Sequence, residues 1–233
     1  MKNIIRNVWF ILATAGAIFM QSNSVIARSA SEVRELKSFN EIEISGPYQV
    51  ILIQGDSESI QISAADDVRN QIISKVEGGE LKVYHRGKLS DAGSITITIQ
   101  FKQLKEVTCN GAVQLLTGTA MKSEKLDLNL NGASTATIEI TSNELEVNIA
   151  GSSNVTLSGK TEKLELEISG SGKVTATGLQ SKNCDIGITG SGKAAVNTNS
   201  LLSVTITGSG AVSYYGEPQV TRNITGSGTV VKI

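Results

Sequence analysis

Residues 164–172 read Leu-Glu-Leu-Glu-Ile-Ser-Gly-Ser-Gly, and close variants of this stretch recur along the second half of the chain. The first glycine of each copy serves as its marker. Successive markers are 21, 19, 19, 20, 18 and 18 residues apart in copies that align on Gly111, Gly132, Gly151, Gly170, Gly190, Gly208 and Gly226. Such a near-constant period predicts stacked supersecondary units. Gly46, which ends residues 42–46, marks a similar and earlier copy.

Hydrophobic and polar residues alternate inside the copies. In most of them the positions six, four and two before the marker glycine are apolar, as in Leu164, Leu166 and Ile168, and the positions between them are polar. A period of two predicts β-strands with one buried face. The repeats contain no stretch with the period and length of a helix, so the sequence predicts an all-β protein.

Two architectures fit this pattern. In a parallel β-solenoid, each unit of about 20 residues is one coil stacked on the next at ~4.8 Å. In a meander or barrel, Gly-Ser-Gly would instead be a hairpin turn between antiparallel strands. The same residue type recurs at the same slot in each unit, which stacking of like on like explains and cross-strand pairing does not. The pattern therefore favours the solenoid.

The repeated Ile-x-Gly-Ser-Gly, the opening Phe39-Asn-Glu-Ile-Glu-Ile-Ser-Gly46 and residues 76–83, Val-Glu-Gly-Gly-Glu-Leu-Lys-Val, resemble a known family. It is the putative auto-transporter adhesin, head GIN domain family, and the resemblance covers roughly residues 36–233. It implies a right-handed parallel β-helix in an exported bacterial protein of no established biochemical role. It brings no catalytic residues to carry over.

The N-terminus has the features of a signal peptide. Lys2 and Arg6 supply positive charge, an apolar run follows from Val8 to Met20, and Ala27 ends a small-residue cleavage site. We predict a signal peptide at 1–27 and a single β-solenoid domain at 28–233, with regular repeats from about 104 to 233. An uncleaved N-terminal anchor is the alternative. Export to the periplasm or the cell surface follows, with no transmembrane segment after cleavage.

The composition excludes some classes of function. The chain has 233 residues, with 21 Lys+Arg against 22 Asp+Glu, 39% hydrophobic and 4% aromatic residues, 23 Gly and 2 Pro. This apolar content excludes a disordered chain. The balanced charge offers no basic field for a phosphate backbone, so we expect no nucleic-acid partner.

The N-terminal third is less regular. Residues 42–53, 59–63, 81–84 and 95–101 read as strands. Residues 66–75 read as a short helix capped by Asp66, with Val68, Ile72 and Ile73 on one face. Its expected role is to cover the open N-terminal end of the solenoid.

The last unit shows no equivalent cap. It ends in Val230-Val-Lys-Ile233, so a homo-oligomer paired through the solenoid ends is one expectation. Protection by Tyr214, Tyr215 and the turn at Glu217-Pro218 is the other.

One row of charged residues faces outward by parity. The position five before the marker glycine is acidic in five consecutive units, in Glu106, Asp127, Glu146, Glu165 and Asp185. Stacked at ~4.8 Å, such charges repel by about 1 kcal/mol per pair even at high dielectric. A calcium ion or a cationic partner would offset this repulsion, and these residues are the candidate metal ligands. The alternative is a solvated strand edge balanced by Lys105, Lys125 and Lys163.

Little in the sequence suggests catalysis. His85 is the only histidine, no Gly-x-Ser-x-Gly elbow occurs, and no His/Cys pattern offers zinc ligands. Cys109 and Cys184 occupy inward slots four coils apart, so we predict two free, buried thiols. Some parallel β-helices act on polysaccharides, and Glu146 with Glu165, or Glu165 with Glu167, would be the pairs to examine for such an activity.

The sequence thus predicts an exported, non-enzymatic β-solenoid without a cofactor that binds a glycan or a protein at the cell surface or in the envelope. The alternative is a structural component of the envelope that associates through the solenoid ends, where Val230 and Ile233 lie.

Overall fold

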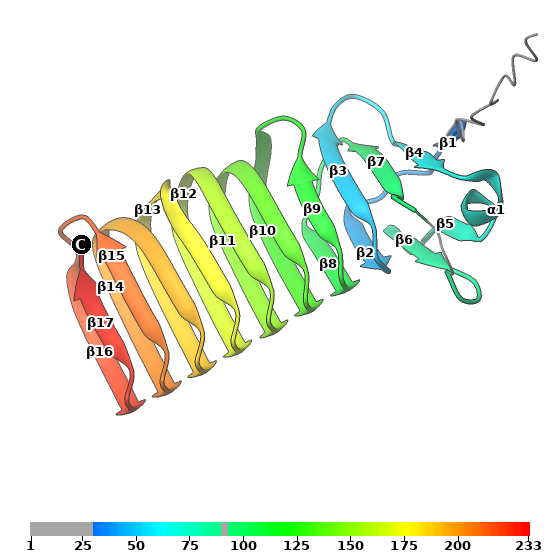
Figure 1. The fold of residues 1–233 in the computed structure, drawn as a ribbon. Coiled ribbons are helices and arrows are strands. Elements are labelled where there is room, and N and C mark those ends of the chain that lie inside the picture. The colour runs from blue at the N-terminus through cyan, green and yellow to red at the C-terminus, as the bar shows by residue number, and fades with distance from the viewer. Residues whose placement is uncertain (1–29, 90–92) are drawn as a thin grey trace, which may run out of the picture.

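The structure is a computed structural model that describes residues 30–89 and 93–233. It is all-β apart from one short helix, and its coils stack side by side into a β-solenoid of about seven turns with coils of about 19 residues (Figure 1). A curled mixed sheet closes the N-terminal end. The predicted signal peptide at 1–27 lies outside the described residues.

Parallel pairing from coil to coil builds the regular part, and its register shifts at a few places, as between Thr156 and Ser158. Leu166 of one coil lies between Val147 and Ile186 of its neighbours, and Gly170 lies between Gly151 and Gly190. This confirms the solenoid and excludes the meander. The strands are β8 (Glu106–Gly111), β9 (Gln114–Thr117), β10 (Met121–Gly132), β11 (Thr135–Gly151), β12 (Asn154–Gly170), β13 (Lys173–Gly190), β14 (Lys193–Gly208), β15 (Ala211–Tyr215), β16 (Gln219–Gly226) and β17 (Thr229–Lys232).

Each long strand bends around one side of the solenoid and so belongs to two faces. The C-terminal halves of β10–β14 pair in one face with β8 at one end and β16 at the other. We call this the ladder face. The N-terminal halves of β11–β14 form the opposite face with β9, β15 and β17.

The marker glycines stand where the chain turns from the ladder face to the opposite face. Gly170 has a φ of +123°, which L side chains rarely adopt. A Cβ atom on Gly170 would also lie 2.5 Å from the carbonyl oxygen of Gly151 in the preceding coil. Ser171 donates its backbone N–H to this same oxygen at 2.9 Å, so the backbone ladder continues through the turn.

The inward slots hold the core, with like residues stacked on like. In the slot two before the marker glycine, Ile149, Ile168 and Ile188 follow one another and are at most 2% exposed. Cys109 and Cys184 occupy inward slots as well, and both are free and buried, as predicted.

The N-terminal third contributes two further stacked strands and a closing sheet. Its elements are β1 (Ala30–Glu35), β2 (Glu41–Ser45), β3 (Gln49–Gln54), β4 (Ser59–Ala64), α1 (Asp66–Arg69), β5 (Ile72–Glu77), β6 (Glu80–His85) and β7 (Thr96–Phe101). β2 pairs in parallel with β8 and β6 and so extends the ladder face, while β3 extends the opposite face by pairing with β9 and β7. Antiparallel β1–β4, β4–β7 and β5–β6 pairs close the end.

Two expectations for this region were wrong in detail. The helix spans only Asp66–Arg69 and is capped by Ala65 without a side-chain hydrogen bond, so Asp66 is not the N-cap. The β-branched Ile72 and Ile73 begin β5, which pairs with β6 across Gly78-Gly79. Residues 42–53 form two strands because the chain turns at Gly46-Pro47 and passes from one face to the other.

Candidate functional site

The five predicted acidic residues lie in one row across five adjacent strands of the ladder face. Asp127 pairs in register with Glu106 and Glu146, and Glu165 pairs with Glu146 and Asp185. All are partly or fully exposed, as their parity predicts. At the C-terminal side the row ends at Ser203.

The row is longer than the repeats alone predict. Glu41 of β2 lies in register with Glu106 on one side and with Glu80 of β6 on the other. We call the complete row the acidic ladder; its members are Glu80, Glu41, Glu106, Asp127, Glu146, Glu165 and Asp185.

The sequence held a signal for one of the two missed residues. Glu41 stands five positions before Gly46, the marker of the earlier copy, so the ladder rule applied to that copy finds it. Glu80 has no such signal, because His85 occupies the position where the marker glycine would stand. Only the β5–β6 hairpin brings Glu80 into the row.

Lysines balance part of the ladder charge. Lys125 Nζ lies 3.4 Å from Asp127 Oδ1 and 3.5 Å from both Glu144 Oε1 and Glu146 Oε2. Lys163 pairs with Glu165, and Lys82 Nζ lies 3.0 Å from Glu80 Oε2. These pairs support the solvated-edge interpretation of the ladder, in which neighbouring lysines offset the repulsion.

Polar side chains two positions further along β8, β10 and β11 are hydrogen-bonded to the ladder. Asn129 Nδ2 donates to Glu106 Oε1 at 3.0 Å, and Asn148 Nδ2 donates to Glu146 Oε1 at 2.9 Å and to Asn129 Oδ1 at 3.1 Å. Amides therefore hold two of the ladder carboxylates in place, and the polar surface is ordered before any ligand arrives.

Two carboxyl groups of this face have raised pKa values. Burial raises the pKa of Asp127, with Glu146 and Glu106 adding to the effect and Lys125 opposing it. Burial also raises the pKa of Glu167, and the nearby charges of Asp185 and Glu165 add to it. Repulsion along the row is thus only partly offset.

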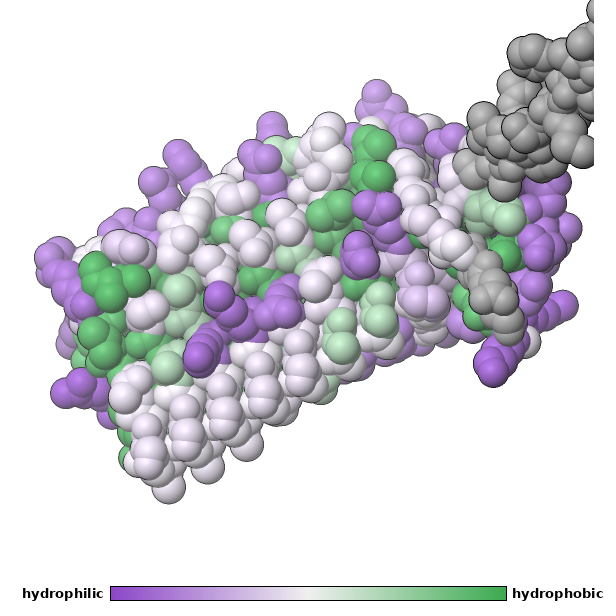
Figure 2. Space-filling view, in the orientation of Figure 1, coloured by the Kyte–Doolittle hydropathy of each residue, from purple (hydrophilic) through white to green (hydrophobic). Residues whose placement is uncertain are grey.

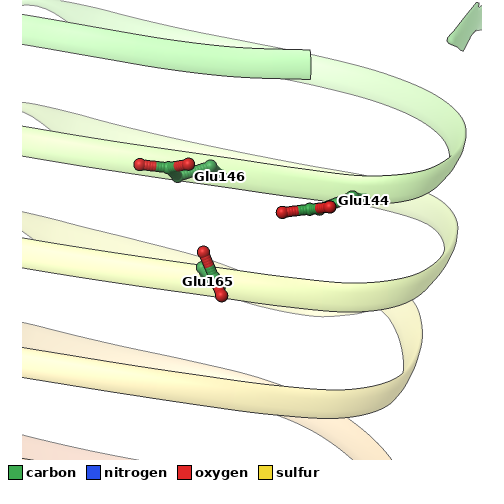
Figure 3. Close-up of side chains that lie close together, drawn as sticks. All are labelled: Glu144, Glu146 and Glu165. Carbon is green, nitrogen blue, oxygen red and sulfur yellow. The ribbon is translucent and has the colours of Figure 1, made fainter. Parts of the chain in front are cut away.

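Three carboxylates come together near the middle of the row (Figure 3). Glu144, Glu146 and Glu165 each place one oxygen within 4.8 Å of the others. Calcium requires six to eight oxygen ligands at 2.3–2.6 Å. Here the ammonium groups of Lys125 and Lys163 contact this cluster and offset part of its charge.

Side chains of like hydropathy form rows on part of the surface. In Figure 2, residues of intermediate hydropathy form regular rows along one edge of the solenoid. Strongly hydrophilic residues stand along the other edge and at both ends, and some also lie in the middle of the visible face. Such ordered rows follow directly from the coil-to-coil register.

The remaining candidate groups have structural partners. His85 Nδ1 lies 2.9 Å from the hydroxyl oxygen of Tyr48, which is 1% exposed. Burial raises the pKa of Tyr48 to about 12 and that of the Cys109 thiol to about 12. Unreactive thiols and a histidine bonded to a core tyrosine fit structural roles better than catalytic ones.

Coils that stack on one another and pair with their neighbours place the protein in the class of β-solenoid repeat proteins. The chain belongs to the family described as putative auto-transporter adhesin, head GIN domain, whose model matches residues 38–218. Membership in this family implies export. No curated protein matches the sequence.

Solved structures share the fold. A putative adhesin from Bacteroides fragilis superposes with a TM-score of 0.84 at 21% identity, covering 88% of this chain and 96% of that one. A putative adhesin from Parabacteroides distasonis gives a TM-score of 0.75 at 21% identity, covering 88% and 96%. A putative lipid binding protein from the same species gives 0.73 at 22% identity, covering 89% and 98%. Neither the family nor the B. fragilis protein is described as an enzyme.

Across residues 30–89 and 93–233, no helix has the length and apolar character needed to cross a bilayer.

Proposed function

We propose that the protein is an exported, non-enzymatic binding protein of the periplasm or the cell surface, and that its ladder face contacts a glycan or protein ligand. The observation that carries this proposal is the acidic ladder itself, a single row of carboxylates that runs through the N-terminal third and most of the regular coils. A repeating row suits a ligand with its own repeat, because each rung offers the same kind of contact.

The absence of a cofactor is part of the proposal. Lysines and amides already contact the ladder carboxylates, so the face can bind a ligand by exchanging these contacts without a metal ion. The turns between the coils are short and uniform, so they provide few residues that could enclose a substrate. Enzymes commonly carry such residues on their loops.

Binding of residues 28–233 to a glycan and peptidoglycan array, with calcium and then with EDTA, tests the proposal. A double change of Glu146→Gln and Glu165→Gln should abolish saturable binding. Glu139→Gln is the matched control, because Glu139 lies on the same strand β11 but in the half that belongs to the opposite face. Unchanged binding by the double variant would show that Glu146 and Glu165 do not contact the ligand and would contradict the proposal.

A second candidate function is assembly through the solenoid end. Within the described residues, β16 pairs only with β14 and β17 only with β15, and Val220, Ile224 and Val230 are only partly buried. An open strand edge can pair with another copy. Analytical ultracentrifugation tests this: a dimer that becomes a monomer with Val230→Lys supports it, whereas a monomer at all concentrations contradicts it.

A further inference from the structure

A groove of about 910 Å³ opens where the N-terminal third meets the first regular coils. Its lining comes from residues 102–106, from residues 122–125 and Asp127 of β10, and from Glu41, Gln54, Asn143 and Glu144. Glu41, Glu106 and Asp127 are three consecutive rungs of the acidic ladder, so the groove is a hollow at the N-terminal part of that row.

Hydrogen bonds fix the backbone around the groove. The side chain of Gln54, at the end of β3, donates to the carbonyl oxygens of Lys102 at 3.0 Å and Lys122 at 2.9 Å, and accepts the N–H of Lys122 at 2.7 Å. Ser123 Oγ donates to the carbonyl oxygen of Leu104 at 2.9 Å. One side chain thus ties two successive coils together, and the groove is held open without a ligand.

The lysines of the groove differ in their pairing. Lys102 Nζ lies 2.9 Å from Glu58 Oε2, and Lys125 contacts Asp127, Glu144 and Glu146. Lys105 and Lys122 also line the groove and are exposed. In the part of the chain that the structure describes, neither has a carboxylate oxygen within 4.0 Å.

The groove therefore offers two unpaired ammonium groups beside a row of carboxylates. Its lining contains no aromatic side chain, so the stacking that holds sugar rings and bases is not available from these residues. Opposite charges side by side in one groove favour a ligand that carries both an anion and a cation, because a ligand of one sign meets like charge on part of the lining.

We propose that this groove binds a short peptide segment that carries an ammonium or guanidinium group and a carboxylate a few residues apart. The carboxylate of the peptide pairs with Lys105 and Lys122, and its cation pairs with the ladder carboxylates of Glu41 and Glu106. This proposal rests on the proposed function, since it places the first contacts of a protein ligand at one end of the ladder face.

Isothermal titration calorimetry with defined peptides tests the proposal. The probes are acetylated and amidated Lys-Ala-Glu, Lys-Ala-Lys and Glu-Ala-Glu, with chitotetraose as a neutral glycan. The dipolar peptide should bind at least about tenfold more tightly than any other probe. Affinity should fall by about tenfold in the double variant Lys105→Ala with Lys122→Ala, and with rising salt.

The matched control is the double variant Lys173→Ala with Lys193→Ala, two lysines in register on the opposite face. It should bind the dipolar peptide like the unchanged protein. Equal binding of all peptides, no binding of the dipolar one, or unchanged binding by the Lys105 and Lys122 double variant would each overturn the proposal. A chitotetraose signal stronger than the peptide signals would assign the groove to glycans and overturn it too.

The two proposals fail separately. If the array binding depends on Glu146 and Glu165 while no peptide binds the groove, the proposed function stands and the groove proposal falls. If the dipolar peptide binds through Lys105 and Lys122 while the array stays silent, the groove proposal stands and the wider ladder is not the site. Thermal unfolding of every variant confirms that the fold is retained.

Discussion

The carbonyl oxygen of Gly151 lies 2.5 Å from the point that a Cβ atom on Gly170 would occupy. The same relationship repeats between successive marker glycines along the solenoid, so each turn is shaped by the one before it. A methyl group at one turn must displace backbone, because no flexible side chain stands in the way.

We therefore expect Gly170→Ala to lower the free energy of unfolding by about 2 kcal/mol or more, from the positive φ and the backbone clash together. Urea denaturation measures this. Gly178→Ala is the control, since its Cβ would meet Ser158 and Leu157 at ordinary distances of 3.4 and 3.5 Å. Equal effects of the two changes would contradict the explanation.

Glu167→Gln should stabilise the protein at pH 7. Burial and neighbouring carboxylates raise the pKa of Glu167, so the folded state holds this proton more tightly than the unfolded state and ionisation costs stability. We expect the unfolding temperature to rise by about 1–2 °C. The gain should disappear below the ordinary pKa of 4.5, where the carboxyl group is neutral in both states. A gain that persists at pH 3 would indicate a cause other than charge.

The Tyr48 phenol should titrate above the ordinary pKa of tyrosine. Burial raises its pKa to about 12 from 10.0, so the folded state keeps a proton that the unfolded state loses. Stability should therefore fall as the pH rises from 10 toward 12. Absorbance at about 295 nm follows the titration, and Tyr48→Phe should remove the late phase and cost about 1 kcal/mol through the lost bond to His85. A single phase for all tyrosines would contradict the burial of Tyr48.

Both thiols should be silent toward Ellman's reagent in the folded protein at pH 8. Cys109 and Cys184 are free and buried, and burial raises the pKa of each thiol, so little reactive thiolate is present. Two thiols should react after denaturation without a reductant. Fewer than two reactive thiols after denaturation would indicate a disulfide. Rapid reaction of the folded protein would show that the thiols are accessible and not buried.

Calcium should leave the unfolding temperature unchanged within about 1 °C, because Lys125 and Lys163 already contact the cluster of Glu144, Glu146 and Glu165 and offset part of its charge. The comparison is differential scanning calorimetry in millimolar calcium and in EDTA. A rise of several degrees that Glu146→Gln removes would show that the cluster holds the ion.

Much of the fold could be predicted because the alternation of apolar and polar residues and the spacing of the marker glycines recur from coil to coil. The inward slots, the outward ladder positions and the buried thiols all follow from counting back from one glycine. Most of the N-terminal third has no marker glycine from which such positions could be counted. There, the spacing of Ile72 and Ile73 fits a short helix, but these residues form a β-strand because they pair with β6.

The groove could not be predicted for a related reason. It depends on the side chain of Gln54 reaching the carbonyl oxygens of Lys102 and Lys122, which are distant from it in sequence, and on which lysines have carboxylate partners. Neither property has a local pattern. Side-chain pairing across coils is set by the register, and the register is known only once the coils are stacked.

The backbone hydrogen bonds between coils continue through the Gly-Ser-Gly turns, and this has a consequence for the evolution of the number of coils. Because each coil bonds only to its neighbours, a whole coil can be gained or lost without a new kind of contact. Length would then change in steps of ~4.8 Å, and every step would add or remove one outward carboxylate or hydroxyl position in each row. Duplication of a coil would thus alter how many ligand units the surface can span, while the chemistry of each contact stays the same.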